Sequence, residues 1–143
     1  MKIVVLKFGG TSVGSIEKIK NISNIILNYK KKGNKVIVVS SAMSGVTNDL
    51  IKKSKKISKS FFDAEYDVLV SSGEQIACSL IAGRLIDRGY KSRSWLSWQV
   101  PIFTQGSHKN SRINKIYKNE IIKYLKAGGI PVVTGFQGVN NQK

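Results

Sequence analysis

The sequence has a single cysteine, a single histidine and only eight acidic residues in 143 positions. One cysteine, Cys78, excludes an internal disulfide framework and fits a reducing cytosol, so we expect a cytoplasmic protein. One histidine, His108, and the lack of any CxxC pair exclude a metal site built from His or Cys. We therefore expect no protein-bound metal.

Long apolar runs are also missing, and none approaches the roughly 18 residues that span a bilayer. The amino-terminal stretch MKIVVLKFGG carries a lysine and two glycines where a signal peptide would stay apolar, which argues against export. Three motifs are absent as well: GxxxxGK[ST], GxGxxG and GxSxG. Their absence argues against a P-loop, a dinucleotide fingerprint and a nucleophile elbow.

Positive charge, in contrast, is abundant, because 24 basic residues give a formal net charge of +16. Such a charge is typical of nucleic-acid binding. However, only four basic residues are arginine, the residue that reads base edges with a bidentate fork. We therefore favour solvated surface lysines over a functional basic patch, and we expect no specific nucleic-acid partner and no membrane partner.

Hydrophobic periodicity predicts one α/β domain. Short apolar runs followed by glycine or hydroxyl residues indicate buried strands, and apolar residues at helical spacing indicate helices between them. The strands are expected at Lys2–Phe8, Lys35–Ser40, Ser92–Trp98 and Ile130–Thr134, and the helices at Ile16–Tyr29, Thr47–Ser60, Asp67–Arg88 and Asn119–Ala127, with a polar loop at Gln105–Arg112. Alternating strands and helices favour a three-layer α/β/α fold with a mainly parallel sheet.

Glycines and hydroxyl residues follow three of the predicted strands, in the segments KFGG, SSAMSG and TGFQG. In parallel α/β sheets, ligands bind at the carboxyl ends of the strands. The glycines of KFGG allow backbone N–H groups to converge on an anion, and Lys7 adds a cation, so a phosphate site is expected. A tight turn from strand to helix, without a ligand, explains the same residues.

Two carboxylates on the third helix form a second candidate feature. Asp67 and Glu74 are seven residues apart, about two helical turns, and therefore lie on one face. Small residues surround Glu74 in SSGEQ, which suits a carboxylate that faces a cleft and a cationic ligand group. An ordinary salt bridge to a lysine is the alternative. We interpret His108 as a solvated loop residue and Cys78 as core packing.

Taken together, these motifs resemble one family. The segments KFGGTSV, VVSSAMSGVTNDL, SSGEQIACSL, NSRI and VVTGFQG are similar, in order and separation, to aspartate kinases of the amino acid kinase group. The resemblance covers essentially the whole chain. It implies an amino acid kinase fold and transfer of the γ-phosphoryl group of ATP, with Mg²⁺, to the side-chain carboxylate of L-aspartate. That reaction is the first step of lysine, threonine and methionine biosynthesis.

The resemblance also implies roles for the residues around the phosphates. Lys7 would be the catalytic residue and neutralise the transferred phosphoryl group. Phe8, Gly9 and Gly10 would form the turn that faces the ATP phosphates. Ser41 would lie at the boundary between the nucleotide phosphates and the acceptor.

A second set of residues would bind the acceptor amino acid. Thr47 and Asn48 would help to hold aspartate, and Glu74 would bind its ammonium group. Arg112 would pair with a substrate carboxylate, and Phe136 would line the pocket.

One departure from the family concerns length. The family continues after GFQGVN with a TTLGRGGSD segment, a nucleotide-binding segment and regulatory domains, none of which this sequence contains. Residues 1–143 therefore resemble only the amino-terminal, acceptor-binding part of the catalytic domain. We expect little kinase activity from the chain alone. The alternative is a non-catalytic fragment or split half that needs a carboxyl-terminal partner chain, or self-associates through an exposed sheet edge.

Two smaller departures lie in the loop GSHKNSR. Lys109 replaces the usual glycine and Ser111 the usual alanine. Both precede Arg112 and bear on where its side chain is placed.

Overall fold

A computed structural model describes residues 2–108 and 110–140. Its centre is a parallel four-stranded sheet in the order β1-β2-β6-β3. These strands are β1 (Ile3–Phe8), β2 (Lys35–Ser40), β3 (Ser92–Trp95) and β6 (Ile130–Thr134). A separate antiparallel hairpin is formed by β4 (Ile102–Gln105) and β5 (Arg112–Ile116). The expected α/β class with a mainly parallel sheet is confirmed.

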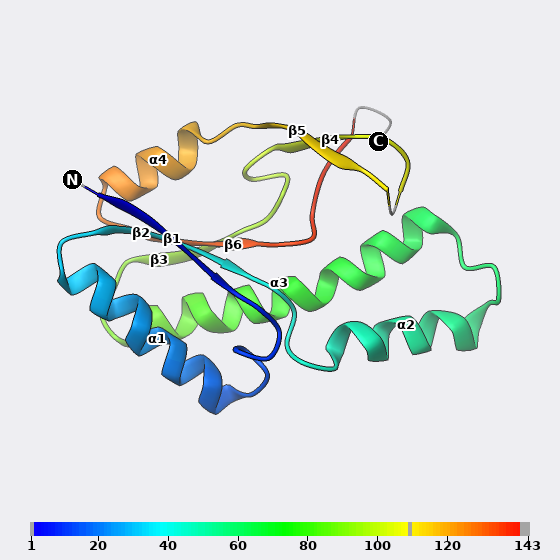
Figure 1. The fold of residues 1–143 in the computed structure, drawn as a ribbon, viewed down its shortest axis with the longest axis horizontal. Coiled ribbons are helices and arrows are strands. Elements are labelled where there is room, and N and C mark those ends of the chain that lie inside the picture. The colour runs from blue at the N-terminus through cyan, green and yellow to red at the C-terminus, as the bar shows by residue number, and fades with distance from the viewer. Residues whose placement is uncertain (1, 109, 141–143) are drawn as a thin grey trace.

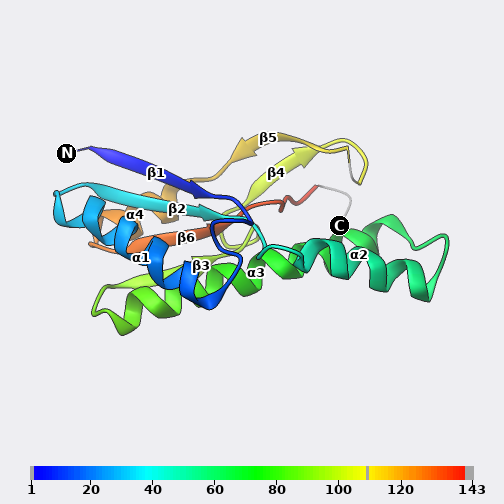
Figure 2. The ribbon, with the colours of Figure 1, turned by 60° about the horizontal axis from the view of Figure 1, so that its bottom comes forward.

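The described residues also form four helices, which lie on the two sides of the sheet (Figures 1 and 2). They are α1 (Ile16–Lys31), α2 (Val46–Ile57), α3 (Asp63–Asp87) and α4 (Asn119–Lys126). Helices α1 and α3 cover one face of the sheet, with α2 packed against α3. Helix α4 and the hairpin lie on the opposite side. The two faces are therefore covered unequally.

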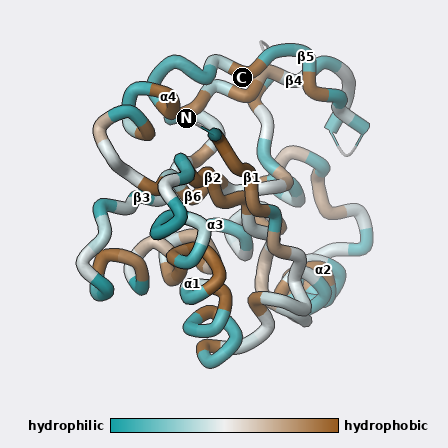
Figure 3. Tube along the Cα trace, turned by 60° about the vertical axis from the view of Figure 1, so that its left-hand side comes forward, coloured by the Kyte–Doolittle hydropathy of each residue, from teal (hydrophilic) through white to brown (hydrophobic). Residues whose placement is uncertain are grey.

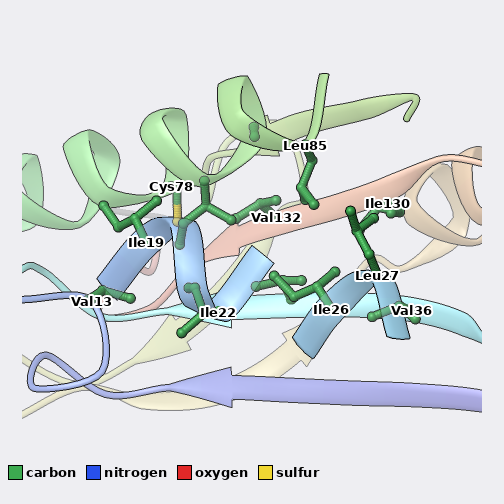
Figure 4. Close-up of a cluster of buried hydrophobic side chains, with 13 residues drawn as sticks. Val13, Ile19, Ile22, Ile26, Leu27, Val36, Cys78, Leu85, Ile130 and Val132 are labelled. Atoms are coloured by element: carbon green, nitrogen blue, oxygen red, sulfur yellow. The ribbon is translucent and has the colours of Figure 1, made fainter. Parts of the chain in front are cut away.

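The face beneath α1 and α3 is closed by a continuous apolar core (Figure 4). Side chains from α1, α3, β2 and β6 interlock there because helical spacing on each helix meets the inward residues of each strand. The buried members are Val13, Ile19, Ile22, Ile26, Leu27, Val36, Val38, Cys78, Ile81, Ala82, Leu85, Ile130 and Val132. The expectation that Cys78 packs in the core is confirmed.

The opposite face has a smaller core under α4, built from Trp95, Val100, Ile121, Leu125 and Val133. Helix α4 is fixed there by Lys35, whose Nζ donates to the carbonyl of Leu125 at 2.8 Å. Away from α4 this face is open. Ile3 and Val5 of the edge strand β1, which is hydrophobic in Figure 3, are 49% and 59% exposed.

Four predictions of secondary structure need correction. The helix expected at Thr47–Ser60 ends at Ile57, three residues earlier. The expected loop Gln105–Arg112 is shorter, because its end residues belong to β4 and β5. The expected strand Ser92–Trp98 ends at Trp95. Helix α3 begins at Asp63, four residues earlier than predicted. Every residue of β5 is exposed, so no alternation of buried and exposed positions marked it as a strand.

Helical spacing also predicts that Ile16, Ile25 and Tyr29 lie on the apolar stripe of the first helix, and Ile76 and Leu80 on that of the third. The structure contradicts these five placements. On α1 the residues Ile16, Ile25 and Tyr29 are exposed, and on α3 the residues Ile76 and Leu80 are exposed. Within residues 2–108 and 110–140, no helix is both long enough and apolar enough to cross a membrane.

Candidate functional site

The first corner of the site is the turn after β1. Backbone bonds from Ser12 N to Gly9 O (2.9 Å) and from Val13 N to Gly10 O (3.3 Å) tighten this turn. A Cβ on Gly10 would lie 3.0 Å from the carbonyl oxygen of Ala42, whereas one on Gly9 would meet nothing within 4 Å. Gly10 thus permits close packing of two loops, and Gly9 leaves its backbone open to solvent.

The second corner follows β2 and lies against the first. The Ser41 amide donates to the carbonyl of Phe8 at 3.0 Å, which joins the two strand ends. Gly45, with φ of 84°, then starts α2, and no side chain caps that helix. Thr47 and Asn48 lie in its first turn, where unpaired backbone N–H groups favour anions.

The third contribution is Glu74 of α3, which is only 8% exposed. Its Oε2 is buried and has no hydrogen-bond partner among the residues that the structure describes. The carboxylate lies over Gly135, directly after β6, so closely that a Cβ there would be 2.7 Å from Oε2. The glycine of TGFQG therefore makes room for the carboxylate. A buried, unpartnered carboxylate oxygen is costly unless a ligand completes it.

Burial raises the pKa of Glu74. The backbone amides of Ala42 and Gly135 and the charge of Lys7 oppose the rise. Although both amides lie near the carboxylate, neither reaches Oε2 as a hydrogen bond. Burial outweighs these opposing groups, so the net effect of the surroundings disfavours the charged form of the carboxyl.

Lys7 and Glu74 meet at the carboxyl edge of the sheet. Lys7 shares one face of β1 with Ile3 and Val5, the face away from α3. Glu74 reaches the same edge from α3. Their charges interact, but the two described side chains form no direct ion pair.

Three other predicted site residues that the structure describes, Phe8, Arg112 and Phe136, have side chains that form no hydrogen bond or ion pair with Lys7 or Glu74. The Phe8 side chain packs against the closed core, so only its backbone takes part in the corner. Arg112 begins β5 and is exposed. Phe136 is 63% exposed, with a left-handed backbone at φ of 44°.

Phe136 borders an apolar cavity of about 590 Å³ on the α4 side of the sheet. The sheet, α4 and the hairpin line it. The apolar lining residues are Ile37, Val39, Val100, Ile102, Ile113, Ile116, Ile121, Ile122 and Val133. Gly135 also lines the cavity and lies beneath Glu74, so the cavity adjoins the Glu74 edge.

The structure pairs His108 with Asp67, two residues to which the sequence pattern assigned no binding role. Nδ1 of His108 lies 2.7 Å from Oδ2 of Asp67, which joins the β4–β5 loop to α3. Ser111 donates to the carbonyl of Ser107 at 2.8 Å, so this departure from the family orders the same loop. Lys109 lies outside the described residues. No group of three His, Cys, Asp or Glu side chains able to hold a metal occurs in the described part of the chain.

Comparison with known proteins identifies the family of the chain. The model of the amino acid kinase family matches residues 2–143. The chain belongs to the amino acid kinase family. It is 45% identical to an aspartokinase of Geobacillus stearothermophilus over 97% of its own length, but it covers only 34% of that protein. This family member thus spans about a third of the curated relative.

Solved structures agree on the fold. The aspartate kinase from Synechocystis superposes with a TM-score of 0.81 at 34% identity, over 97% of this chain and 22% of that one. E. coli aspartokinase III, in complex with aspartate and ADP, superposes with a TM-score of 0.80 at 19% identity, over 99% of this chain and 42% of that one. The latter likeness concerns the fold alone.

Proposed function

We propose that residues 1–143 form the acceptor-binding part of an aspartate kinase. The complete enzyme would transfer the γ-phosphoryl group of ATP to the side-chain carboxylate of L-aspartate and yield 4-phospho-L-aspartate. This is the first step towards lysine, threonine and methionine, and its expected location is the cytoplasm. The similarity to aspartokinases and the aspartate and ADP bound by the E. coli protein support the proposal.

The observation that carries the proposal is the unpartnered Oε2 of Glu74. An ammonium group brings three donors and a positive charge, which would satisfy the oxygen and compensate its burial. The open first turn of α2, with Thr47 and Asn48, and the exposed guanidinium of Arg112 are the groups proposed to receive the two carboxylates of aspartate. An amino acid with a second carboxylate fits this set.

On the nucleotide side, Lys7 and the open backbone at Gly9 fit a phosphate group. Ser41 is proposed to separate the phosphates from the acceptor, and Phe136 to line the acceptor pocket. The described residues offer no carboxylate cluster for Mg²⁺. The metal would therefore be held mainly by the ATP phosphates, where it neutralises charge when bound.

The chemistry needs no general base on the protein. The side-chain carboxylate of aspartate is already deprotonated, so one of its oxygens attacks the γ-phosphorus while the bond to the ADP oxygen breaks. The residues act by placing the acceptor and by offsetting charge. Lys7 stabilises the phosphoryl oxygens, and Glu74 orients the amino acid.

Ligand binding to the 143-residue chain tests the acceptor site. L-Aspartate should bind more tightly than succinate, which has both carboxylates but no ammonium group, in isothermal titration calorimetry. Glu74→Gln should abolish that preference while the weak binding of succinate stays the same. Equal affinity of the unmodified chain for the two compounds would contradict the proposal.

Activity is a separate expectation. The chain alone should form no aspartyl hydroxamate from ATP, aspartate and hydroxylamine, because the remaining two thirds of the relatives have no counterpart in it. Robust hydroxamate formation by the pure chain would show that the missing part is dispensable.

A second candidate function is a binding half that works with another chain. The exposed apolar residues Ile3 and Val5 on the free edge of β1 favour it, because such edges pair with other strands. A separate carboxyl-terminal chain of the same family, or a second copy of this chain, would cover that edge. Sedimentation of the chain alone distinguishes the second copy from the separate partner.

A further inference from the structure

The β4–β5 hairpin lies outside the main sheet, and hydrogen bonds of the described residues join it to the rest of the chain at two places in addition to its apolar residues at the cavity. It pairs with no strand of the four-stranded sheet, and all five residues of β5 are exposed. Its base joins the segment after β6, and its tip lies above the amino-terminal half of α3 (Figure 1). Its orientation therefore depends on these two attachments.

The attachment at the base is made by the backbone. Thr104 N donates to Val139 O at 2.8 Å, and Val139 N donates to Ile102 O at 2.9 Å. A Cβ on Gly138 would lie 2.2 Å from Cγ2 of Thr104, so only glycine allows this approach. The base cannot shift without breaking these bonds.

The attachment at the tip is the contact between His108 Nδ1 and Asp67 Oδ2 at 2.7 Å. The loop behind it is internally ordered. Ser111 Oγ donates to Ser107 O at 2.8 Å, and Asn110 N donates to Ser107 O at 3.1 Å. The loop can therefore transmit the position of His108 to the start of β5, where Arg112 lies.

The other end of the contact is on the helix that carries Glu74. Asp67 and Glu74 are separated by seven residues, or about 10 Å along one face of α3. A helix of 25 residues is a stiff spacer. Joining the loop to Asp67 thus limits how far the start of β5, where Arg112 lies, can move from the part of α3 that carries Glu74.

We propose that the His108–Asp67 contact is a clasp that holds the hairpin against α3 and thereby positions Arg112 for the acceptor amino acid. His108 is a positioning residue in this account, since it acts through Arg112. The inference rests on the proposed function for the identity of the ligand. The clasp itself is a property of the free chain.

The test compares single and double variants with two measurements. His108→Ala and Asp67→Ala should each accelerate hydrogen exchange of the backbone amides at 112–116 and weaken L-aspartate binding about fivefold, as expected for one charge-assisted hydrogen bond. The double variant should be no weaker than either single one, because the second change removes a contact already lost. His108→Asn keeps a donor near Nδ1 and should restore most of the affinity.

The matched control is Asp87→Ala, which removes the ion pair with Arg84 at the far end of the same helix. It should leave both measurements unchanged. A merely structural role of His108 would instead weaken aspartate binding and loosen all of α3, with no rescue by asparagine.

The two measurements separate this inference from the proposed function. If the unmodified chain binds no aspartate, the proposed function is wrong. Unchanged hydrogen exchange in the His108 and Asp67 variants would, independently, overturn the clasp. If aspartate binds but additive losses appear in the double variant, the clasp is wrong. Faster exchange with unchanged aspartate affinity would likewise overturn the positioning of Arg112.

Discussion

The two faces of the central sheet differ in how completely they are covered. On the α1–α3 side, Ile26, Ile81 and Leu85 are fully buried in one continuous core. On the other side, α4 covers only part of the sheet, and a cavity of about 590 Å³ and the apolar edge of β1 remain open. The closed face thus carries most of the core, whereas the other face leaves apolar surface uncovered.

The largest expected effect compares equal substitutions on the two faces. Ile26→Ala should lower the free energy of unfolding by about 3 kcal/mol, because it leaves a cavity in a closed core. Ile3→Ala should cost less than about 1 kcal/mol, since Ile3 is already half in solvent. Urea denaturation measures both. Similar losses would show that the β1 edge is covered in solution.

Association should depend on the open edge. Ile3→Lys should weaken self-association of the chain roughly tenfold in sedimentation equilibrium, because a charge on an edge strand disfavours pairing. Ile57→Lys is the control, since Ile57 is 81% exposed at the end of α2, away from this edge. A monomeric unmodified chain would rule out a second copy at this edge, and equal weakening by both variants would show that the β1 edge is not the contact.

The Glu74 carboxylate, at the carboxyl edge of the sheet, should lower the stability of the folded chain when no ligand is bound. Because burial raises the pKa of Glu74, the folded chain binds a proton more readily than the unfolded chain. Stability should therefore fall as pH rises from the ordinary glutamate pKa of about 4.5 through the raised folded value. Glu74→Gln should stabilise the chain by about 1 kcal/mol at neutral pH, as an unpartnered buried charge is removed.

Thermal denaturation at several pH values checks this sign. The advantage of Glu74→Gln should shrink at pH values below 4.5, where Glu74 is protonated in both states. A variant that is less stable than the unmodified chain at neutral pH would mean that the folded protein already neutralises the carboxylate.

The smallest expected effect concerns the Cys78 thiol on the closed face, which should stay unreactive in the folded chain. Burial, with the nearby charge of Glu74, raises the pKa of the Cys78 thiol to about 12. The thiol should therefore not react with a disulfide reagent at pH 8 until the chain unfolds. Rapid native-state reaction, followed by absorbance, would show that the α1–α3 face opens.

Local sequence patterns predicted the strands and helices whose hydrophobic residues recur at regular spacing. Strands β1, β2 and β6 were recognised because each is a short apolar run that ends at glycine or hydroxyl residues. Strand β5 was missed because RINKI lies outside the core, and its pairing with β4 supplies the only regularity. Burial of Ile76 and Leu80 was predicted wrongly because α3 is apolar on more than one side.

Prediction of the candidate site from the sequence was limited in the same way, because its contacts join residues that are far apart in the chain. The sequence singled out Lys7 and Glu74 from their settings, but no local pattern showed that Glu74 lies over Gly135, 61 positions away. The pairing of Asp67 with His108, 41 residues apart, is equally non-local. Such contacts are set by how the helices and loops pack.

The central claim is that the Glu74 carboxylate is kept open for the ammonium group of an acidic amino acid. Its most direct test is an NMR titration of the Glu74 side-chain carboxyl with and without saturating ligand. The account predicts a raised pKa in the free chain, a clear fall with L-aspartate and no fall with succinate. A Glu74 pKa that is the same in the presence and absence of L-aspartate would contradict the claim.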